Sequence, residues 1–354
     1  MRVLQLIDSL DGGGAERIAI NLANCLSTHT EKSFLCATRK EGILKSTISN
    51  KVEYLHLQRN NTLDILSLIR LSKYVRVNKI THIHAHSTSF FLGVLVYFLN
   101  RKIKIIWHDH YGDSEHLEKR DFKVLKWFSR YFDCIIAVNE KLKTWSELNL
   151  KCNKVYFIIN FVNDNQSEVL NEEIKGEGTF KIVCLANVRP QKDHLNLLKA
   201  YSIAQKQLSN ISLHLIGSVN KESEIYRELS NYIDKHKINQ VYFYGSKQIT
   251  QTFLKQFDIG VLSSRSEGLP VAILEYANAK LPTIVTNVGQ CADVIEERGI
   301  IVPPQDSKKL AKAIITLYND GNLQDKFATL QYNFVMKHYS SKSVIPQLIK
   351  IYSH

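Results

Sequence analysis

Short apolar runs alternate along this chain with longer segments in which apolar residues recur about every three to four positions. Residues 3–7 form the first apolar run, which is typical of a buried strand. The segment 15–26 places its apolar residues on one helical face, namely Ile18, Ala19, Leu22, Ala23 and Leu26. This repeated alternation predicts parallel sheets covered by helices on both faces.

The alternation runs through both halves of the chain. In the first half we predict strands at 3–7, 33–37, 52–57, 82–85, 103–107, 134–138 and 155–159. In the second half we predict them at 180–185, 212–216, 241–244, 259–262, 283–285 and 300–302. The fold class is therefore α/β, with two Rossmann-like, doubly wound parallel-sheet domains.

The length of 354 residues supports two domains, because a single core rarely grows beyond about 250 to 300 residues. Residues 163–179 are polar, acidic and glycine-containing, as expected of a linker. We predict domains at 1–165 and 166–340 and a last helix near 343–352. Open parallel sheets bind ligands beyond the carboxyl ends of their strands, so we expect two domains facing each other across one cleft.

The clearest candidate site is a predicted strand-to-helix turn that carries two carboxylates, Glu267 and Glu275. Pro270 fits the first turn of the helix, where its missing N–H costs nothing. We expect the backbone N–H groups of Gly268 and Leu269 to point out of the helix start, where they suit a phosphate oxygen.

Glu275 lies among apolar residues, so we expect a buried carboxylate. Burial without a partner is costly, and hydroxyls or a cation should therefore meet it. A glutamate at a helix edge facing water is the alternative interpretation.

Glu267-Gly268-Leu269-Pro270 followed by Glu275 resembles the Glu-x7-Glu signature of the retaining family 4 glycosyltransferases, which have the two-domain GT-B fold. The resemblance extends to 281–289 and 299–304. It implies that Glu267 binds hydroxyls of the donor sugar, that Glu275 binds the ribose, and that a tail at 341–354 crosses back to the first domain. The chain differs from the family pattern at three positions that border the donor pocket and bear on sugar specificity: Lys280, Gln290 and Asp293.

Arg189 and Lys192 follow the strand predicted at 180–185, and Asp193 is placed to cap the next helix. Solvated loop cations are common, but a forked guanidinium beside a compact ammonium also suits a diphosphate. The Arg-x-x-Lys spacing resembles the diphosphate-binding pair of family 4. By the same resemblance, Asn187 belongs to the donor site.

Gly13 and Gly14 lie in a glycine loop that opens the first helix. A simple tight turn explains these glycines, but the sequence Gly-Gly-Ala-Glu-Arg is similar to the first loop of the family. That loop would approach either the donor diphosphate or the transferred sugar.

Histidines gather after two of the predicted strands. His108 and His110 flank an aspartate, yet no further ligands show a metal-binding spacing. Resemblance to the family instead gives His110 a place near the transferred sugar, with His108 as the second choice. His82, His84 and His86 would point the same way from a strand, with His82 structural. We place His86, and with it His108, on the acceptor side.

The resemblance implies transfer of a sugar from a nucleotide-diphosphate sugar to a hydroxyl of a glycan or lipid-linked acceptor, with retention, in bacterial surface polysaccharide synthesis. We assign catalytic roles to Glu267, His110, Arg189 and Lys192, and we expect no metal or other cofactor. A sugar-nucleotide epimerase on the same fold is one alternative. A non-catalytic protein that binds sugar nucleotides or docks on a membrane is another.

The net charge of +12 suggests phosphorylated substrates, an anionic membrane or nucleic acid as partners. Nucleic-acid motifs are absent from the sequence, so we exclude that class. The six cysteines have no metal or C-x-x-C spacing and are interpreted as buried thiols. No signal peptide or apolar run of about 20 residues is visible, so we expect a cytoplasmic protein that is peripheral to the membrane.

Residues 117–132 combine basic and aromatic side chains and predict a basic amphipathic helix. Lys119, Arg120, Lys123 and Lys126 would face either an anionic membrane or water. In the second case a stripe of Leu117, Val124, Leu125, Phe128 and Phe132 would pack in the core.

Overall fold

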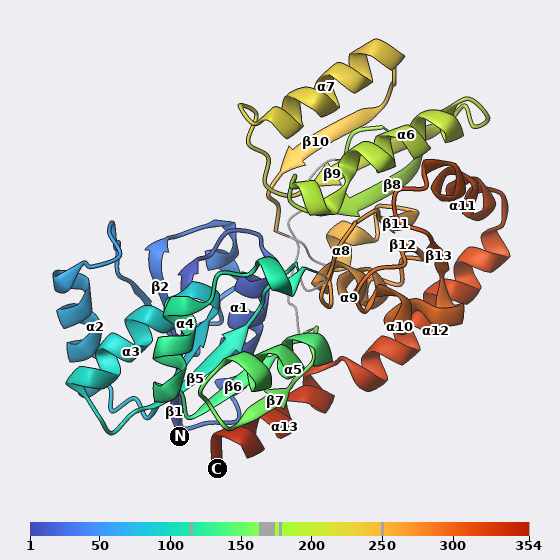
Figure 1. Ribbon diagram of the computed structural model, residues 1–354. Coiled ribbons are helices and arrows are strands. Elements are labelled where there is room, and N and C mark those ends of the chain that lie inside the picture. The colour runs from blue at the N-terminus through green and yellow to red at the C-terminus, as the bar shows by residue number, and fades with distance from the viewer. Residues whose placement is uncertain (114–115, 163–173, 177–178, 249–250, 354) are drawn as a thin grey trace. The chain divides into compact units, whose positions relative to one another are not determined.

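The computed structural model describes residues 1–113, 116–162, 174–176, 179–248 and 251–353 (Figure 1). The chain divides into two compact units, Met1–Asn163 with Ser341–His354, and Asp164–Ser340. Most of the linker predicted at 163–179 lies outside the described residues.

The first unit is built on a parallel sheet in the order β3-β2-β1-β4-β5-β6-β7. Its strands are β1 (Arg2–Ser9), β2 (Lys32–Lys40), β3 (Val52–His56), β4 (His82–His86), β5 (Lys104–Asp109), β6 (Cys134–Ala137) and β7 (Val155–Phe157). Its helices are α1 (Gly14–Leu26), α2 (Ile65–Val77), α3 (Phe90–Leu99), α4 (Lys123–Phe128), α5 (Glu140–Asn149) and α13 (Ser341–Ser353). Short 3₁₀ helices lie at Ile43–Thr47, Ser87–Ser89, Leu117–Lys119 and Ser129–Tyr131.

The second unit has a parallel sheet in the order β10-β9-β8-β11-β12-β13. Its strands are β8 (Phe180–Leu185), β9 (Ile211–Ile216), β10 (Val241–Gly245), β11 (Ile259–Leu262), β12 (Thr283–Thr286) and β13 (Ile300–Val302). Its helices are α6 (His194–Gln205), α7 (Glu224–His236), α8 (Gln251–Leu254), α9 (Val271–Asn278), α10 (Cys291–Ile295), α11 (Ser307–Asn319) and α12 (Gly321–His338), with 3₁₀ turns at Pro190–Lys192 and Glu296–Arg298.

The predicted fold class is confirmed, because every predicted strand exists and all pair in parallel. The predicted end of the strand at 103–107 was wrong, and this affects the site. β5 continues through Asp109, so His108 belongs to the strand and only His110 follows it. The six cysteines are buried, as interpreted from their spacing, and none of them is in a disulfide.

The two faces of the first sheet differ in chemistry. Ile83, Ala85 and Trp107 point into an apolar core that includes residues of α2 and α3. The alternate positions of β4 place His82, His84 and His86 on the opposite face, all buried. This second face therefore holds polar rings where a parallel sheet usually buries aliphatic side chains.

The basic amphipathic helix predicted at 117–132 was wrong. The segment breaks into a 3₁₀ turn, the short helix α4 and a second 3₁₀ turn. Arg120 does not face solvent, since its guanidinium is largely buried against Asp109. Val124, assigned to the core stripe, is exposed, whereas Leu125, Phe128 and Phe132 are buried.

Helix α13 belongs to the first unit although it ends the chain. It buries Val344, Ile345, Leu348 and Tyr352, at positions that share one helical face. Within the described residues, no helix is long and apolar enough to cross a bilayer.

Candidate functional site

In the second unit the candidate residues gather where the strand order reverses. β8 lies beside both β9 and β11, so the connections leaving β8 and β11 diverge to opposite faces of the sheet. The loop after β8 carries Lys192, and the loop after β11 carries Glu267. Ligands of open α/β sheets bind at this kind of switch point.

Lys192 and Glu267 form an ion pair across these two loops. The Lys192 Nζ atom lies 2.5 Å from Glu267 Oε1, and the Ser264 hydroxyl donates to the same oxygen. Glu267 is only 4 % exposed, and the nearby ammonium of Lys192 offsets the cost of burying its carboxylate. The sequence predicted both residues for the donor site, and the structure brings them into direct contact.

A second ion pair fixes the same loops. Arg265 Nη2 donates to Asp193 Oδ1 at 2.9 Å, and Arg265 Nε forms an ion-pair contact with Asp193 Oδ2 at 2.8 Å. The Asp193 carboxylate also accepts from the backbone N–H of Asn196 and thus caps α6, as predicted. The Ser263 hydroxyl donates to the carbonyl oxygens of Lys192 and Asp193. These contacts hold the loops rigid relative to each other.

The loop after β12 supports the turn that contains Glu267. Gly289 has φ of +51°, and a Cβ there would collide with the carbonyl oxygen of Glu267. The Gln290 N–H donates to the carbonyl oxygen of Gly268 at 3.0 Å. A glycine is therefore required at 289 for both its conformation and this close approach.

The other predicted donor residues lie near the pair in sequence but differ in their surroundings. Arg189 is exposed, in the loop that leads to Lys192. Asn187 uses its side-chain oxygen to accept from the Ser218 N–H at 2.8 Å, so only its amide NH₂ remains for a ligand. Pro270 is the N-cap of α9, one position earlier than predicted. Glu275 is half-buried, so the expectation of a fully buried carboxylate was wrong.

In the first unit the strand order reverses between β1 and β4. The loop after β1 contains Gly13, the N-cap of α1, and Gly14, its first residue. The carboxylate of Glu16 lies over Gly13 and accepts from the Ser9 hydroxyl at 3.0 Å. An acidic group at this helix start opposes the binding of a phosphate and favours hydroxyl donors.

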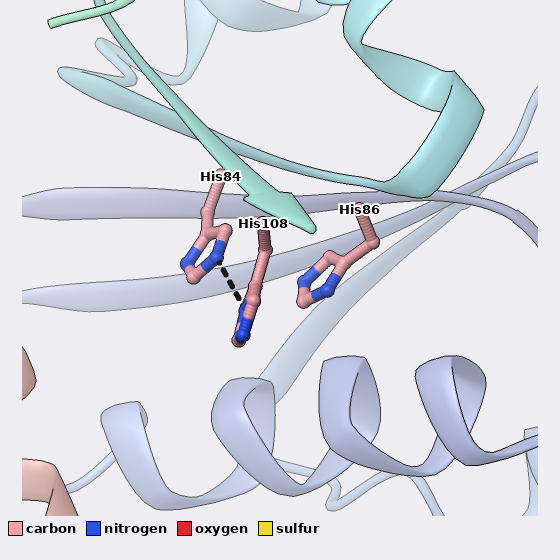
Figure 2. A group of neighbouring side chains, drawn as sticks. All are labelled: His84, His86 and His108. Carbon is pink, nitrogen blue, oxygen red and sulfur yellow. Dashed lines mark hydrogen bonds between the residues drawn. The ribbon is translucent and has the colours of Figure 1, made fainter. Parts of the chain in front are cut away.

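Beside this loop, β4 and β5 carry a cluster of four histidines (Figure 2 shows three). His84 Nε2 lies 3.0 Å from His108 Nδ1, and His86 Nδ1 lies 2.9 Å from His110 Nε2. Two groups outside the cluster complete the contacts. The Tyr352 hydroxyl lies 2.5 Å from His84 Nδ1, and Gln5 Oε1 lies 2.8 Å from His86 Nε2.

Burial keeps these rings uncharged. Desolvation lowers the pKa values of His84, His86 and His108 well below the usual range, and neighbouring imidazoles add to the effect. Desolvation also lowers the pKa of His110 to about 3. His110 is the member that is partly exposed. His82 is structural, as predicted, and lies 3.1 Å from the carbonyl oxygen of Tyr352.

Nitrogen atoms of His84, His86 and His108 lie within 4.8 Å of one another, which is compatible with a metal site. The contacts described above, however, already engage most ring nitrogens. Among the described residues, His108 Nε2 is the one ring nitrogen of this trio that is buried without a hydrogen-bond partner.

Asp109, between the two site histidines, has a structural role. It forms a bidentate pair with Arg120 at 2.7 and 2.9 Å, and its carboxylate also accepts from the Tyr111 N–H. The guanidinium lies 4.4 Å from the ring centroids of both Tyr111 and Trp145. This buried cluster fixes the chain on either side of His110.

Sequence reasoning missed Gln5, Ser264, Arg265 and Tyr352. A signal existed for Gln5, because a polar residue interrupts the apolar run of β1. Tyr352 gave none, since its contact with His84 joins residues that are 268 positions apart.

Two family models match the chain over adjoining segments. The model described as Glycosyltransferase Family 4 matches residues 12–166, and the model of glycosyl transferases group 1 matches residues 165–333. Together the two models span residues 12–333, so the chain is a glycosyltransferase with a family 4 domain followed by a group 1 domain.

Relatives of this glycosyltransferase include enzymes of bacterial polysaccharide synthesis. It is 22 % identical to the amylovoran biosynthesis glycosyltransferase AmsD of Erwinia amylovora, over 92 % of this chain and 93 % of AmsD. It is 23 % identical to the O-antigen biosynthesis glycosyltransferase WbnH of Escherichia coli, over 80 % and 81 % of the two chains.

Among solved structures, the glycosyltransferase is similar to Anabaena HepE in complex with UDP and glucose. The TM-score is 0.83 at 18 % identity, covering 100 % of this chain and 99 % of HepE. Sucrose-phosphate synthase from Thermosynechococcus elongatus has a TM-score of 0.77 at 15 % identity, covering 100 % and 98 %. These similarities establish the GT-B fold.

Proposed function

We propose that this glycosyltransferase moves a sugar from a nucleotide-diphosphate sugar to a hydroxyl of a glycan or lipid-linked acceptor, with retention of the anomeric configuration, in bacterial surface polysaccharide synthesis. The observation that carries the proposal is the Lys192–Glu267 pair at the switch point of the second sheet. The similarity to HepE, which was solved with UDP-glucose, supports a donor of this class.

Departure of the nucleotide diphosphate develops negative charge on a phosphate oxygen. Lys192 is held by Glu267 before any ligand arrives, so its ammonium can stabilise that charge without reorganising. Arg189 is exposed and supplies a forked set of donors to the second phosphate. We assign no step to a metal ion, and this assignment remains a prediction.

The two glutamates have separate roles in this proposal. Glu267 binds hydroxyls of the donor sugar through its carboxylate, which Lys192 and Ser264 orient. Glu275 accepts from the ribose hydroxyls, and its half-buried position on α9 leaves it accessible to a ligand. Gly268, Leu269 and Pro270 lead into α9, whose N-terminus favours an anion.

The first unit contributes groups for hydroxyls. Glu16 makes the loop of Gly13 and Gly14 acidic, so of the two ligands predicted for it we favour the sugar over the diphosphate. His110 contacts the transferred sugar, and His86 lies behind it. His108 is fully integrated in β5 and buried, so we no longer place it against the acceptor.

A donor screen tests the proposal. Thermal unfolding is followed with UDP, GDP, their hexose conjugates and no ligand, because a ligand that binds only the folded state raises its stability. The best donor is then incubated with a lipid-linked acceptor, and the product anomer is assigned by NMR. We expect transfer with retention and full activity in excess chelator.

Three outcomes separate the alternatives. An inverted product contradicts the retaining mechanism. Conversion of the donor sugar without an acceptor identifies an epimerase. Binding of a donor without any reaction, across a panel of acceptors, identifies a non-catalytic sugar-nucleotide-binding protein.

We also propose that the first unit docks on anionic membrane through α2 rather than through residues 117–132. Ile65, Leu66 and Ile69 are 68 %, 75 % and 55 % exposed, and Leu63 just before the helix is 73 % exposed. The same helix exposes Arg70, Lys73 and Arg76. Exposed apolar side chains interleaved with cations suit a lipid interface, where each cation contributes about 1 kcal/mol.

Vesicle sedimentation tests this surface. Replacing Leu66 and Ile69 with Ser should reduce binding to phosphatidylserine vesicles about tenfold or more, because buried apolar area is lost. The matched control replaces Leu148, which is 79 % exposed on α5, with Ser. Equal binding of wild type and the α2 variant would contradict the assignment.

A further inference from the structure

The histidine cluster of the first unit contains a chain of hydrogen bonds that starts at Gln5 and ends at the partly exposed His110. Three rings of the cluster are buried, and their contacts restrict where each proton can lie. The position of each proton follows from these contacts, beginning at Gln5.

The contact with Gln5 determines which nitrogen of His86 carries the proton. The side-chain oxygen of Gln5 lies 2.8 Å from His86 Nε2, and a carbonyl oxygen can only accept. His86 must therefore carry its proton on Nε2.

The tautomer of His86 determines the tautomer of His110. A neutral imidazole with its proton on Nε2 has a lone pair on Nδ1. His86 Nδ1 lies 2.9 Å from His110 Nε2, so His110 must donate from Nε2. A neutral His110 then has a lone pair on Nδ1, the ring nitrogen that the contacts of the described residues leave for a ligand.

We propose that Gln5 and His86 are positioning residues that hold His110 in the Nε2–H form, so that Nδ1 accepts a hydrogen bond from a hydroxyl of the bound sugar. The ligand is thus a neutral hydroxyl donor rather than a phosphate or carboxylate. The inference rests on the proposed glycosyl transfer and adds the polarity of this contact to it.

A metal ion bound by the same rings is the competing interpretation. Zn²⁺ needs nitrogen lone pairs at about 2.0 to 2.1 Å. His86 Nδ1 and His108 Nδ1 already form hydrogen bonds with neighbouring imidazoles at 2.9 and 3.0 Å, so a metal would have to replace these hydrogen bonds. The observed contacts therefore favour the hydrogen-bonded network.

The tautomer can be measured directly and without any activity. In protein labelled with ¹⁵N-histidine, long-range ¹H–¹⁵N correlation distinguishes a protonated from an unprotonated ring nitrogen. His110→Asn identifies the signals of His110. We expect a proton on Nε2 and none on Nδ1 in the wild type. A proton on Nδ1, or on both nitrogens, at neutral pH would overturn the proposal.

A variant at Gln5 tests the cause. Gln5→Leu removes the acceptor and frees His86 to reverse, so the Nδ1 signal of His110 should become protonated. His82→Gln is the matched control, since His82 lies on the same face of β4 but outside this chain of contacts. An unchanged pattern in a folded Gln5→Leu protein would refute the positioning role, and the wild-type spectrum decides if that variant does not fold.

Kinetics supply the second readout. Gln5→Leu should lower kcat about tenfold, the loss of one hydrogen bond of about 1.4 kcal/mol, with the KM for the donor within about twofold. His82→Gln should retain kcat within about threefold. If the wild type transfers no sugar from any donor, the proposed function fails, while the spectra still decide the tautomer. One equivalent of Zn²⁺ should leave the histidine signals unchanged, and stoichiometric binding that shifts them would overturn the network in favour of a metal site.

Discussion

The carboxyl edges of the two sheets carry opposite kinds of chemistry. In the second unit, Lys192, Glu267, Arg265 and Asp193 form ion pairs across the loops after β8 and β11. In the first unit, the corresponding edge carries a cluster of uncharged histidine rings and their hydrogen bonds, beside the carboxylate of Glu16 and the Asp109–Arg120 pair. The difference matches the two parts of a sugar nucleotide, because a diphosphate is bound by charge and a sugar hydroxyl by oriented neutral donors and acceptors.

The largest effect should come from removing a charge in the second unit. Lys192→Ala should lower kcat about one hundredfold or more, since the departing diphosphate loses its preorganised cation. Arg189→Ala should act in the same direction but less strongly, because Arg189 is exposed and solvent weakens its field. Lys199→Ala, on the exposed face of α6, is the control. Turnover of Lys192→Ala within threefold of wild type would exclude the role.

Variants of the two glutamates should have different effects, one on sugar transfer and the other on nucleotide binding. Glu267→Gln should lower transfer about thirtyfold while the nucleotide diphosphate still binds, because hydrogen bonds to a charged group contribute about 1.5 to 3 kcal/mol. Glu275→Gln should instead weaken binding of the nucleotide diphosphate, since an amide offers one acceptor oxygen in place of two. Calorimetric titration of both variants with the nucleotide diphosphate decides the matter. Loss of nucleotide affinity in Glu267→Gln but not in Glu275→Gln would show that the assignments of sugar and ribose to the two glutamates are reversed.

A backbone change should damage the second site without touching a charge. Gly289→Ala should cost about 2 kcal/mol of unfolding free energy, because alanine is strained at positive φ and its Cβ meets the Glu267 carbonyl oxygen. Thermal unfolding measures the loss. Gly321→Ala provides the comparison, since a Cβ at Gly321 has open space. Equal melting temperatures for the two variants would show that the loop after β12 adapts.

The smallest effect is a difference in acid sensitivity between the units. A histidine whose folded pKa is depressed takes up its proton first in the unfolded chain, so stability falls as pH drops through about 6.5. The first unit has five such residues, His82, His84, His86, His108 and His110, and the second has His194 and His214.

At pH 6.5 each of these residues costs about 0.4 kcal/mol relative to alkaline pH, because half of the unfolded imidazoles are protonated. The first unit should therefore lose about 1 kcal/mol more than the second. Hydrogen exchange read by mass spectrometry between pH 8 and 6.5 reports each unit separately. Equal losses in the two units would contradict the assigned neutral cluster.

The sequence predicted the charged site better than the neutral one for a physical reason. Lys192 and Glu267 lie in short motifs beside strand ends, and the parallel topology brings such ends together. The orientation of His110 depends instead on Gln5, which reaches it through His86 from another strand. No local pattern encodes a contact of that kind.

The predicted helix at 117–132 failed for a related reason. Its basic and apolar residues have helical spacing, but Arg120 pairs with Asp109 and lies between two aromatic rings. That tertiary contact outweighs local propensity and ends the helix before it can continue. The strands were predicted well because apolar runs of this length report burial directly.

The position of α13 has a consequence for biosynthesis. Its Tyr352 contacts both His82 and His84 in β4, so a segment synthesised after the whole second unit completes the packing of a sheet whose strands were synthesised before that unit. A nascent first unit keeps the polar face of β4 uncovered until α13 has been synthesised, while the second unit has all of its own strands earlier. Premature termination within α13 would thus leave the unit made first, rather than the unit made last, unable to mature.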